Sequence, residues 1–162
     1  MKKDIKIAVI GVGHLGKHHV QHLSSIENVA LAGVFDTDRV RAEEISNRFK
    51  IDCFNSIQDL LNSVDAVSIV TPTKSHKAVA EVCIKAGKHV FIEKPITETV
   101  EEADALIGLS KEQNTIIQVG HIERLNPALL PLSEYELNPK FVEVQRLAPY
   151  MIRGSDVPVV LD

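Results

Sequence analysis

Three glycines near the N-terminus have the spacing of a loop that receives an anion. Gly11, Gly13 and Gly16 directly follow the aliphatic run Ile5–Ile10. Glycine has no Cβ, so it allows tight turns and close approach to the backbone. A helix opening at Leu15 or Gly16 would point its first, unpaired N–H groups toward this loop. Such a helix terminus suits phosphate, so the stretch predicts a pyrophosphate site.

An acidic residue lies where a bound dinucleotide would need one. Asp36 follows Gly16 by 20 residues and ends the predicted strand Val29–Phe35. In dinucleotide-binding domains an acid at this place accepts hydrogen bonds from the adenine ribose hydroxyls. A carboxylate there would repel a 2′-phosphate, which favours NAD over NADP, although Arg39 and Arg41 could soften that preference.

Polar and ionisable residues also follow the other predicted strands at their carboxyl ends, where ligands bind in open α/β sheets. These ends carry TPTKSH at 71–76, EKP at 93–95 and GHIER at 120–124. Hydride transfer from an alcohol needs a base for the hydroxyl proton, or a cation that holds the developing alkoxide. Lys94 is the best-placed residue for that role, and a solvated surface lysine is the alternative.

Strands and helices are predicted to alternate along residues 5–120. The predicted strands are 5–10, 29–35, 51–54, 66–70, 88–93 and 115–120, and the helices are 15–25, 39–49, 57–64, 75–86 and 100–113. We expect Asp38, Ser56 and Thr99 to cap the helices that follow them. Short aliphatic strands are typical of a sheet covered by helices on both faces. The unit βαβαβ, given twice, predicts a doubly wound parallel sheet, the Rossmann fold.

Two of these helices have predicted inward faces that can be checked. For the helix 75–86 the inward residues are Ala78, Val79, Val82, Cys83 and Ala86, and for the helix 100–113 they are Val100, Ala103, Leu106 and Ile107. Both sets follow from three-four apolar spacing. A domain that binds S-adenosylmethionine can begin in a similar way, but the full order of six strands is less typical of one.

The pattern changes after Gly120. A polar turn precedes a short helix opened by Pro127, and residues 140–150 have the partial alternation of a strand. We therefore divide the chain into a dinucleotide-binding domain, residues 1–122, and the truncated start of a second α/β domain, residues 123–162. A strand at 141–147 without a partner would favour self-association.

Five stretches together resemble the Gfo/Idh/MocA oxidoreductases. They are AVIGVGHLGKHH, FDTD, TPTKSH, FIEKPI and VGHIERLNPA, and the resemblance covers nearly the whole chain, about 150 residues. The resemblance implies an NAD(P)-dependent enzyme that acts on sugars, inositols or nucleotide sugars. The stretches VGHIERLNPA and RLAPYMIRGSDVPVVLD look most like the branch whose members oxidise the 3-hydroxyl of a UDP-N-acetylhexosamine or its uronate.

The resemblance also implies roles for individual residues. Lys94, before a cis peptide bond to Pro95, would be catalytic and would contact substrate, while His121 and Arg124 would border the substrate pocket. For His76, packing in the interior is an equally good interpretation of the sequence. The residues at the cofactor would be Gly11, Gly13, His14, Leu15, Gly16, Asp36, Thr71, Pro72, His76 and Glu93.

Members of this family are longer, and their C-terminal half covers the substrate and carries a further motif with Asp and His. That motif would lie beyond Asp162, so we expect this chain to bind the cofactor with little or no turnover by itself. The family resemblance also implies a homo-oligomer. The alternative function is a non-catalytic NAD-binding module, or a partner subunit, derived from such a dehydrogenase.

Composition argues against several other classes. The net charge is −4, 44% of residues are hydrophobic and 25% are charged, as in ordinary soluble domains. There is no basic run that would favour nucleic acid or an anionic membrane surface. The apolar stretches are far shorter than the roughly 18 residues of a membrane helix.

The cysteines and histidines complete the expectations. Cys53 and Cys83 are isolated, which is typical of reduced thiols in a cytoplasmic protein. His14, His18 and His22 have helical spacing, but His14 precedes the helix proper, so we expect no metal site. His19 is expected to be solvated.

Overall fold

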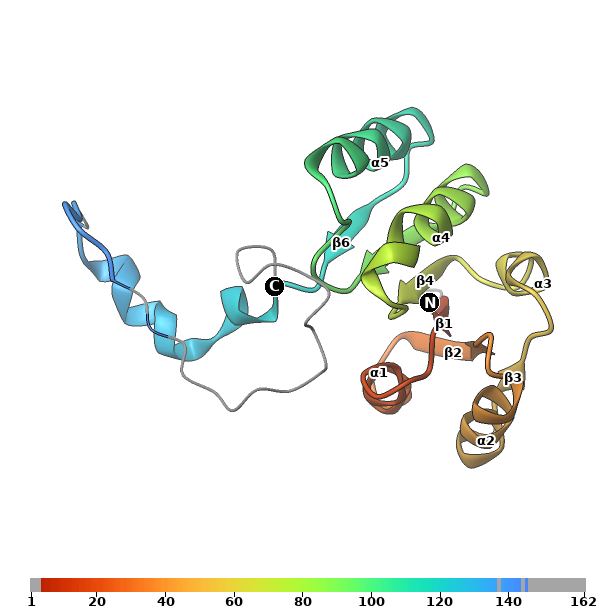
Figure 1. Cartoon of the computed structure of the whole chain (residues 1–162). Helices are drawn as coiled ribbons and strands as arrows, with labels where there is room; N and C mark the ends of the chain where they lie inside the picture. The colour runs from red at the N-terminus through yellow and green to blue at the C-terminus, as the bar shows by residue number, and fades with distance from the viewer. Residues whose placement is uncertain (1–3, 137, 144, 146–162) are drawn as a thin grey trace. The chain divides into compact units, whose positions relative to one another are not determined.

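One parallel sheet forms the centre of the first part of the chain (Figure 1). The structure is a computed structural model that describes residues 4–136, 138–143 and 145. The chain divides into two units, residues 1–120 and 121–162. In the first unit the strand order is β3-β2-β1-β4-β5-β6, with every neighbouring pair parallel. The strands are β1 (Ile5–Ile10), β2 (Val29–Phe35), β3 (Asp52–Cys53), β4 (Ala66–Ile69), β5 (His89–Ile92) and β6 (Ile117–Val119).

This order confirms the predicted doubly wound Rossmann fold. The strand order reverses between the neighbouring strands β1 and β4. The carboxyl ends of these two strands therefore form the topological switch point. Five helices connect the strands: α1 (Gly16–Leu23), α2 (Arg39–Phe49), α3 (Ile57–Leu61), α4 (Thr73–Lys85) and α5 (Val100–Glu112).

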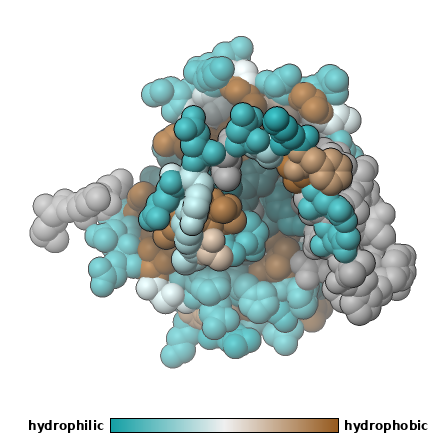
Figure 2. Space-filling view, turned by 90° about the vertical axis from the view of Figure 1, so that its left-hand side faces the viewer, coloured by the Kyte–Doolittle hydropathy of each residue, from teal (hydrophilic) through white to brown (hydrophobic). Residues whose placement is uncertain are grey.

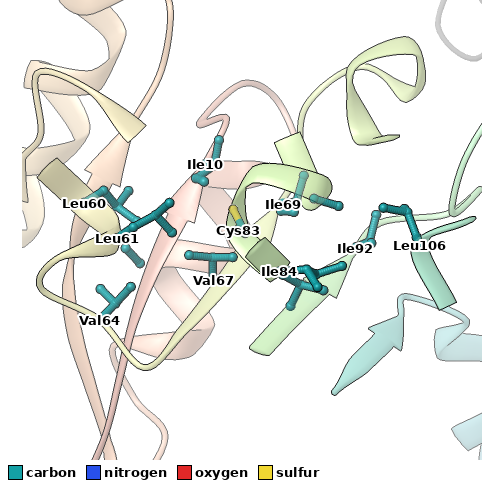
Figure 3. Packing of buried hydrophobic residues seen from close by; sticks show 13 residues of the cluster. Ile10, Leu60, Leu61, Val64, Val67, Ile69, Cys83, Ile84, Ile92 and Leu106 are labelled. Atoms are coloured by element: carbon teal, nitrogen blue, oxygen red, sulfur yellow. The ribbon is translucent and has the colours of Figure 1, made fainter. Parts of the chain in front are cut away.

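Each face of the sheet carries its own apolar core. Residues of α1 and α2 pack on one face, around Val9, Val20 and Val34. Residues of α3, α4 and α5 pack on the other, where Ile69 and Ile92 are among the fully buried side chains (Figure 3). Burial on both faces explains why these strands are aliphatic without alternation.

Three helix starts are set by local sequence, as predicted. The side chains of Asp38, Ser56 and Thr99 accept hydrogen bonds from the backbone N–H three residues later, which caps α2, α3 and α5. By contrast, α1 and α4 begin at Leu15 and Pro72 without any side-chain cap. The two uncapped helices are those that follow β1 and β4, at the switch point.

The inward face of α4 differs from the prediction. Ala78 and Ala86 are exposed and Val82 keeps 44% of its surface exposed. Of the predicted set only Cys83 is fully buried, and the other buried positions are Thr73, His76, Ala80 and Ile84. The prediction from apolar spacing was wrong because two polar residues, Thr73 and His76, face inward. The imidazole of His76 can be buried because backbone carbonyl groups lie within hydrogen-bond distance of both its nitrogens.

The face predicted for α5 was also partly wrong. Leu106 is buried, but Val100 and Ile107 are 67% and 41% exposed. Ser110 is buried instead, because its hydroxyl donates to the carbonyl oxygen of Thr115 at 2.8 Å. A serine whose hydroxyl is hydrogen-bonded can therefore be buried, while the isoleucine that the apolar pattern assigned to the core is exposed.

The second unit begins with two short 3₁₀ helices, Ile122–Leu125 and Pro127–Glu134. The predicted turn and Pro127 helix thus form as two tighter helices, the second capped by the Asn126 side chain. The predicted strand 140–150 is not present in its described part, residues 140–143 and 145, which have no regular structure. The rest of that strand lies outside the described residues.

Exposed apolar side chains occur in both units. On the face in Figure 2 brown areas lie among hydrophilic residues. In the second unit several exposed apolar side chains follow one another closely along the chain, among them Leu129, Leu130 and Leu132. Within the described part of the chain, no helix combines the length and apolarity that crossing a membrane requires. In the same part, no group of three or more metal-ligating side chains is assembled.

Candidate functional site

The carboxyl ends of the strands lie in one row. The register aligns Phe35, Ile10, Ile69, Ile92 and Val119 across five strands. The next residue in each case is therefore a neighbour along the same edge: Asp36, Gly11, Val70, Glu93 and Gly120. This alignment brings the polar residues that follow the strands, among them Asp36 and Glu93, to one edge of the sheet.

The glycine loop is shaped by close backbone contacts. Gly11 has φ +89°, and its N–H donates to the carbonyl oxygen of Phe35 at 2.8 Å. A Cβ on Gly11 would lie 2.7 Å from the carbonyl oxygen of Val70, and one on Gly16 would collide with the carbonyl oxygen of Gly11. These two glycines are needed by the fold itself.

Gly13 is different, because nothing lies within 4 Å of the place where its Cβ would be. The protein's own packing therefore does not require glycine at this position. The tip of the loop faces open space directly before the uncapped first turn of α1. Leu15 and His14, next to Gly13, are exposed, and the arrangement leaves the loop backbone accessible to an anion.

Asp36 joins the glycine loop to the end of β2. Its carboxylate accepts the N–H of Val12 at 2.8 Å and the N–H of Asp38 at 2.9 Å, and its side chain is 8% exposed. Arg41 approaches the carboxylate to 3.6 Å while pairing with Asp38 at 2.9 Å. Arg39 is held elsewhere, by Glu43 and the carbonyl of Phe54, so Arg41 is the arginine that lies next to Asp36.

His76 ties two strand-end loops together. Its ring nitrogens lie 2.9 Å from the carbonyl oxygen of Pro95 and 2.8 Å from that of Thr71, and the residue is 1% exposed. A carbonyl only accepts, so a neutral ring can donate to one of them and an imidazolium to both. Because both nitrogens face backbone groups, the geometry favours the packing interpretation of His76 over direct contact with a cofactor.

Thr71 carries an unsatisfied group beside the switch point. Its hydroxyl is buried and has no hydrogen-bond partner in the described structure. Buried hydroxyls are nearly always paired, so this hydroxyl has hydrogen-bonding capacity left for a bound group. Pro72 follows as the residue from which α4 begins, and its side chain offers no cap.

Glu93 and Lys94 occupy the end of β5. Lys94 is half-buried and is followed by the cis peptide bond to Pro95 that the resemblance implied. One carboxylate oxygen of Glu93 accepts the backbone N–H of Lys94 at 3.2 Å, and the other lies 3.1 Å from Nε2 of His19. Burial alone would raise the pKa of Glu93, but the hydrogen bonds from His19 and Lys94 outweigh it and hold that pKa below its ordinary value.

The expectation that His19 is solvated was wrong. Its side chain is 19% exposed, its Nδ1 lies 2.9 Å from Oγ of Ser68, and its ring packs edge-on against Phe91. The sequence held one signal of this: Ser68 interrupts the aliphatic strand AVSIV. A buried serine needs a hydrogen-bond partner, and His19 provides it.

His121 and Arg124 belong to the second unit and are exposed there. Their expected contact with substrate therefore stays a prediction.

The first unit has the features that a bound dinucleotide requires. The loop tip at Gly13 is open, α1 has no side-chain cap, and the Thr71 hydroxyl is orphaned at the switch point. The carboxylate oxygens of Asp36 each have a lone pair beyond the backbone bonds that they accept. This set fits a pyrophosphate at the loop and ribose hydroxyls at the acid.

Comparison with known proteins identifies relatives with the same fold. The family model for Gfo/Idh/MocA proteins, described as an oxidoreductase family with an NAD-binding Rossmann fold, matches residues 5–121. UDP-N-acetylglucosamine 3-dehydrogenase of Acidithiobacillus ferrooxidans is 46% identical over 159 residues, covering 98% of this chain and 50% of the relative. The NAD(+)-dependent scyllo-inositol 2-dehydrogenase of Bacillus subtilis is 35% identical over 134 residues, covering 79% and 39%.

Solved structures agree with these matches. The A. ferrooxidans UDP-N-acetylglucosamine 3-dehydrogenase, GnnA, superposes with a TM-score of 0.89 over 98% of this chain and 50% of the other, at 46% identity. GenD2 from gentamicin A biosynthesis, solved in complex with NAD, gives a TM-score of 0.78 at 25% identity, over 82% of this chain and 38% of the other. The chain thus spans about half the length, or less, of the relatives that it matches.

Proposed function

Because the chain belongs to the Gfo/Idh/MocA oxidoreductase family, we propose that it supplies the NAD-binding and proton-handling part of a nucleotide-sugar dehydrogenase. The substrate class that we propose is a UDP-N-acetylhexosamine, oxidised at a ring hydroxyl. The 46% identity to a UDP-N-acetylglucosamine 3-dehydrogenase over nearly the whole chain carries this proposal.

The chain's own residues divide the work of binding. The loop at Gly11, Gly13 and Gly16, with the first turn of α1, would hold the pyrophosphate. Asp36 would accept hydrogen bonds from the adenine ribose, and the orphaned Thr71 hydroxyl would pair with a cofactor group. Bound NAD supplies the hydride acceptor.

Lys94 would handle the proton. As a hydride leaves the carbon of the substrate, the proton of the hydroxyl on that carbon has to be taken up, and an amine at the end of β5 can receive it. In the reverse direction a charged Lys94 returns the proton and stabilises the developing alkoxide. Glu93 stays ionised beside it, because its pKa lies below the ordinary value.

Calorimetry with NAD and NADP on this chain tests the binding part. We expect NAD to bind and NADP to bind more weakly, because the Asp36 carboxylate would repel a 2′-phosphate. An absence of heat with both dinucleotides, from a chain with a normal melting transition, would refute the proposal.

The catalytic part is tested in a hybrid, in which the part of this chain that aligns with the A. ferrooxidans enzyme over 159 residues replaces the matching segment of that enzyme. We expect turnover of UDP-N-acetylglucosamine with NAD, and a loss of roughly 10²- to 10⁴-fold in kcat for Lys94→Ala. The exposed Lys111 at the end of α5 is the matched control. Equal kcat for both variants would remove Lys94 from the mechanism, and a folded hybrid that binds NAD without turnover would support the non-catalytic module instead.

We further propose a cytoplasmic setting and a homo-oligomeric assembly. Cys83 is buried, and burial raises the pKa of its thiol to about 12, so it stays protonated and unreactive. Light scattering over a range of concentrations tests the assembly, and a constant monomer mass would refute it.

A further inference from the structure

A chain of three polar side chains crosses one face of the sheet. It runs from Ser68 on β4 to His19 on α1 and then to Glu93 after β5, with distances of 2.9 Å and 3.1 Å. Ser68 is 2% exposed, and the side chains of His19 and Glu93 are 19% and 14% exposed. The core that packs on this face is built around the apolar side chains of Val9, Val20 and Val34.

The chemistry fixes the direction of one bond. The Glu93 side chain is a carboxylate and only accepts, so Nε2 of His19 is the donor. At the other ring nitrogen the Ser68 hydroxyl can donate to Nδ1 of a neutral ring or accept from a charged one. Ser68 therefore fixes the ring orientation in either state, and Phe91 packs against the same ring in a T-shaped arrangement.

The effect continues from Glu93 to Lys94. The second oxygen of Glu93 accepts the N–H of Lys94 at 3.2 Å, so the carboxylate bridges α1 and the backbone of the lysine. Gly120, after β6, makes room for it, because a Cβ there would lie 2.9 Å from a Glu93 oxygen. The carboxylate is thus held by His19 on α1 and by the backbone of Lys94, in space that Gly120 leaves open.

We propose that His19 is a positioning residue, which holds the Glu93 carboxylate and through it the backbone of Lys94 at the end of β5. The inference rests on the proposed function, in which Lys94 handles the proton. A purely structural role is a weaker explanation, because an apolar side chain in place of a buried polar pair is often neutral or stabilising.

Two substitutions separate the two ring nitrogens. His19→Gln keeps an N–H donor near the position of Nε2, whereas His19→Asn reaches only as far as Nδ1 and loses the donor to Glu93. His22→Asn, at an exposed position on the same helix, is the matched control. Thermal melting of each variant reports whether the fold is kept.

The first readout is the ionisation of the Glu93 carboxyl group, which a ¹³C NMR pH titration of this chain measures. We expect the acid dissociation constant of Glu93 to fall about tenfold in His19→Asn, because burial is then opposed by Lys94 alone, and to change little in His19→Gln and His22→Asn. An unchanged Glu93 titration in His19→Asn would overturn the proposal. This readout needs no cofactor, so it stands even if the chain does not bind NAD.

The second readout is turnover in the hybrid enzyme. We expect a loss in kcat of up to roughly 100-fold for His19→Asn, with the KM for NAD little changed, since only an interaction felt at the reacting group is lost. His19→Gln should recover most of the kcat. Equal losses in the two variants would show that the ring serves packing alone and would also overturn the proposal.

Discussion

Replacing Gly13 with alanine separates what the fold needs from what a ligand needs. No atom lies within 4 Å of the added methyl, and the backbone at Gly13 is not in the left-handed region, which is occupied at Gly11 and Gly87. The methyl group therefore meets no protein atom. Alanine also has fewer conformations in the unfolded chain, which stabilises the folded state by about 0.4–1 kcal/mol. The melting temperature of Gly13→Ala should stay the same or rise by a few degrees.

The same methyl group should weaken NAD binding. If the pyrophosphate approaches the loop at its tip, the added carbon occupies part of that space, and overpacking of this kind costs about 1–3 kcal/mol. That range corresponds to roughly 5- to 150-fold weaker binding. Calorimetry gives the affinity and a thermal melt gives the stability, both on the same preparation.

Two further glycines serve as controls. Gly108 in α5 also has nothing within 4 Å of its missing Cβ, so Gly108→Ala should stabilise the helix by up to about 1 kcal/mol and leave NAD affinity unchanged. Gly16→Ala should lower the melting temperature, because its Cβ would collide with the Gly11 carbonyl oxygen. A Gly13→Ala variant that melts normally and binds NAD as tightly as the parent would refute the placement of the pyrophosphate at this loop.

Three other changes follow from the same edge of the sheet. Asp36→Asn removes the charge beside the ribose site, so we expect calorimetry to show about tenfold weaker NAD binding. NADP should bind more tightly, because Arg41, 3.6 Å from the Asp36 carboxylate, is then free of that charge; an unchanged ratio of the two affinities would contradict this. Gly120→Ala should displace the Glu93 carboxylate, which its Cβ would approach to 2.9 Å, and lower kcat in the hybrid enzyme with NAD affinity retained; an unaltered kcat would count against it. Since the folded-state pKa of Glu93 is depressed, its contribution to stability is present above its ordinary unfolded value of about 4.3 and is lost as pH falls through the folded value. Denaturant titrations of the parent and Glu93→Gln should therefore converge at low pH.

Local signals predicted most of the fold correctly. Asp38, Ser56 and Thr99 cap their helices because each contact spans only three residues, which a short sequence window contains. The strand ends were also placed well enough to bring Asp36 and Lys94 to one edge, since parallel strands of a doubly wound sheet must end on the same side.

The failures were long-range and polar. His19 was assigned to solvent because its partner Ser68 lies 49 residues away, and no local pattern connects them. Likewise, α4 was turned toward the wrong face because His76 is buried against backbone carbonyls that come from two separate loops. Apolar periodicity indicates which side chains avoid water. It cannot identify a buried polar side chain whose hydrogen-bond partners lie far away in the sequence.

These two histidines have a common consequence for the reacting lysine. His76 holds the carbonyl of Pro95, which follows Lys94, and His19 holds the carboxylate of Glu93, which precedes it. The backbone on both sides of Lys94 is thus fixed by imidazole rings from two helices, α1 and α4, that pack on opposite faces of the sheet. A lysine side chain is long and mobile, so precise proton transfer depends on a fixed point of attachment. Loss of either ring should therefore lower kcat in the hybrid enzyme more than it weakens NAD binding.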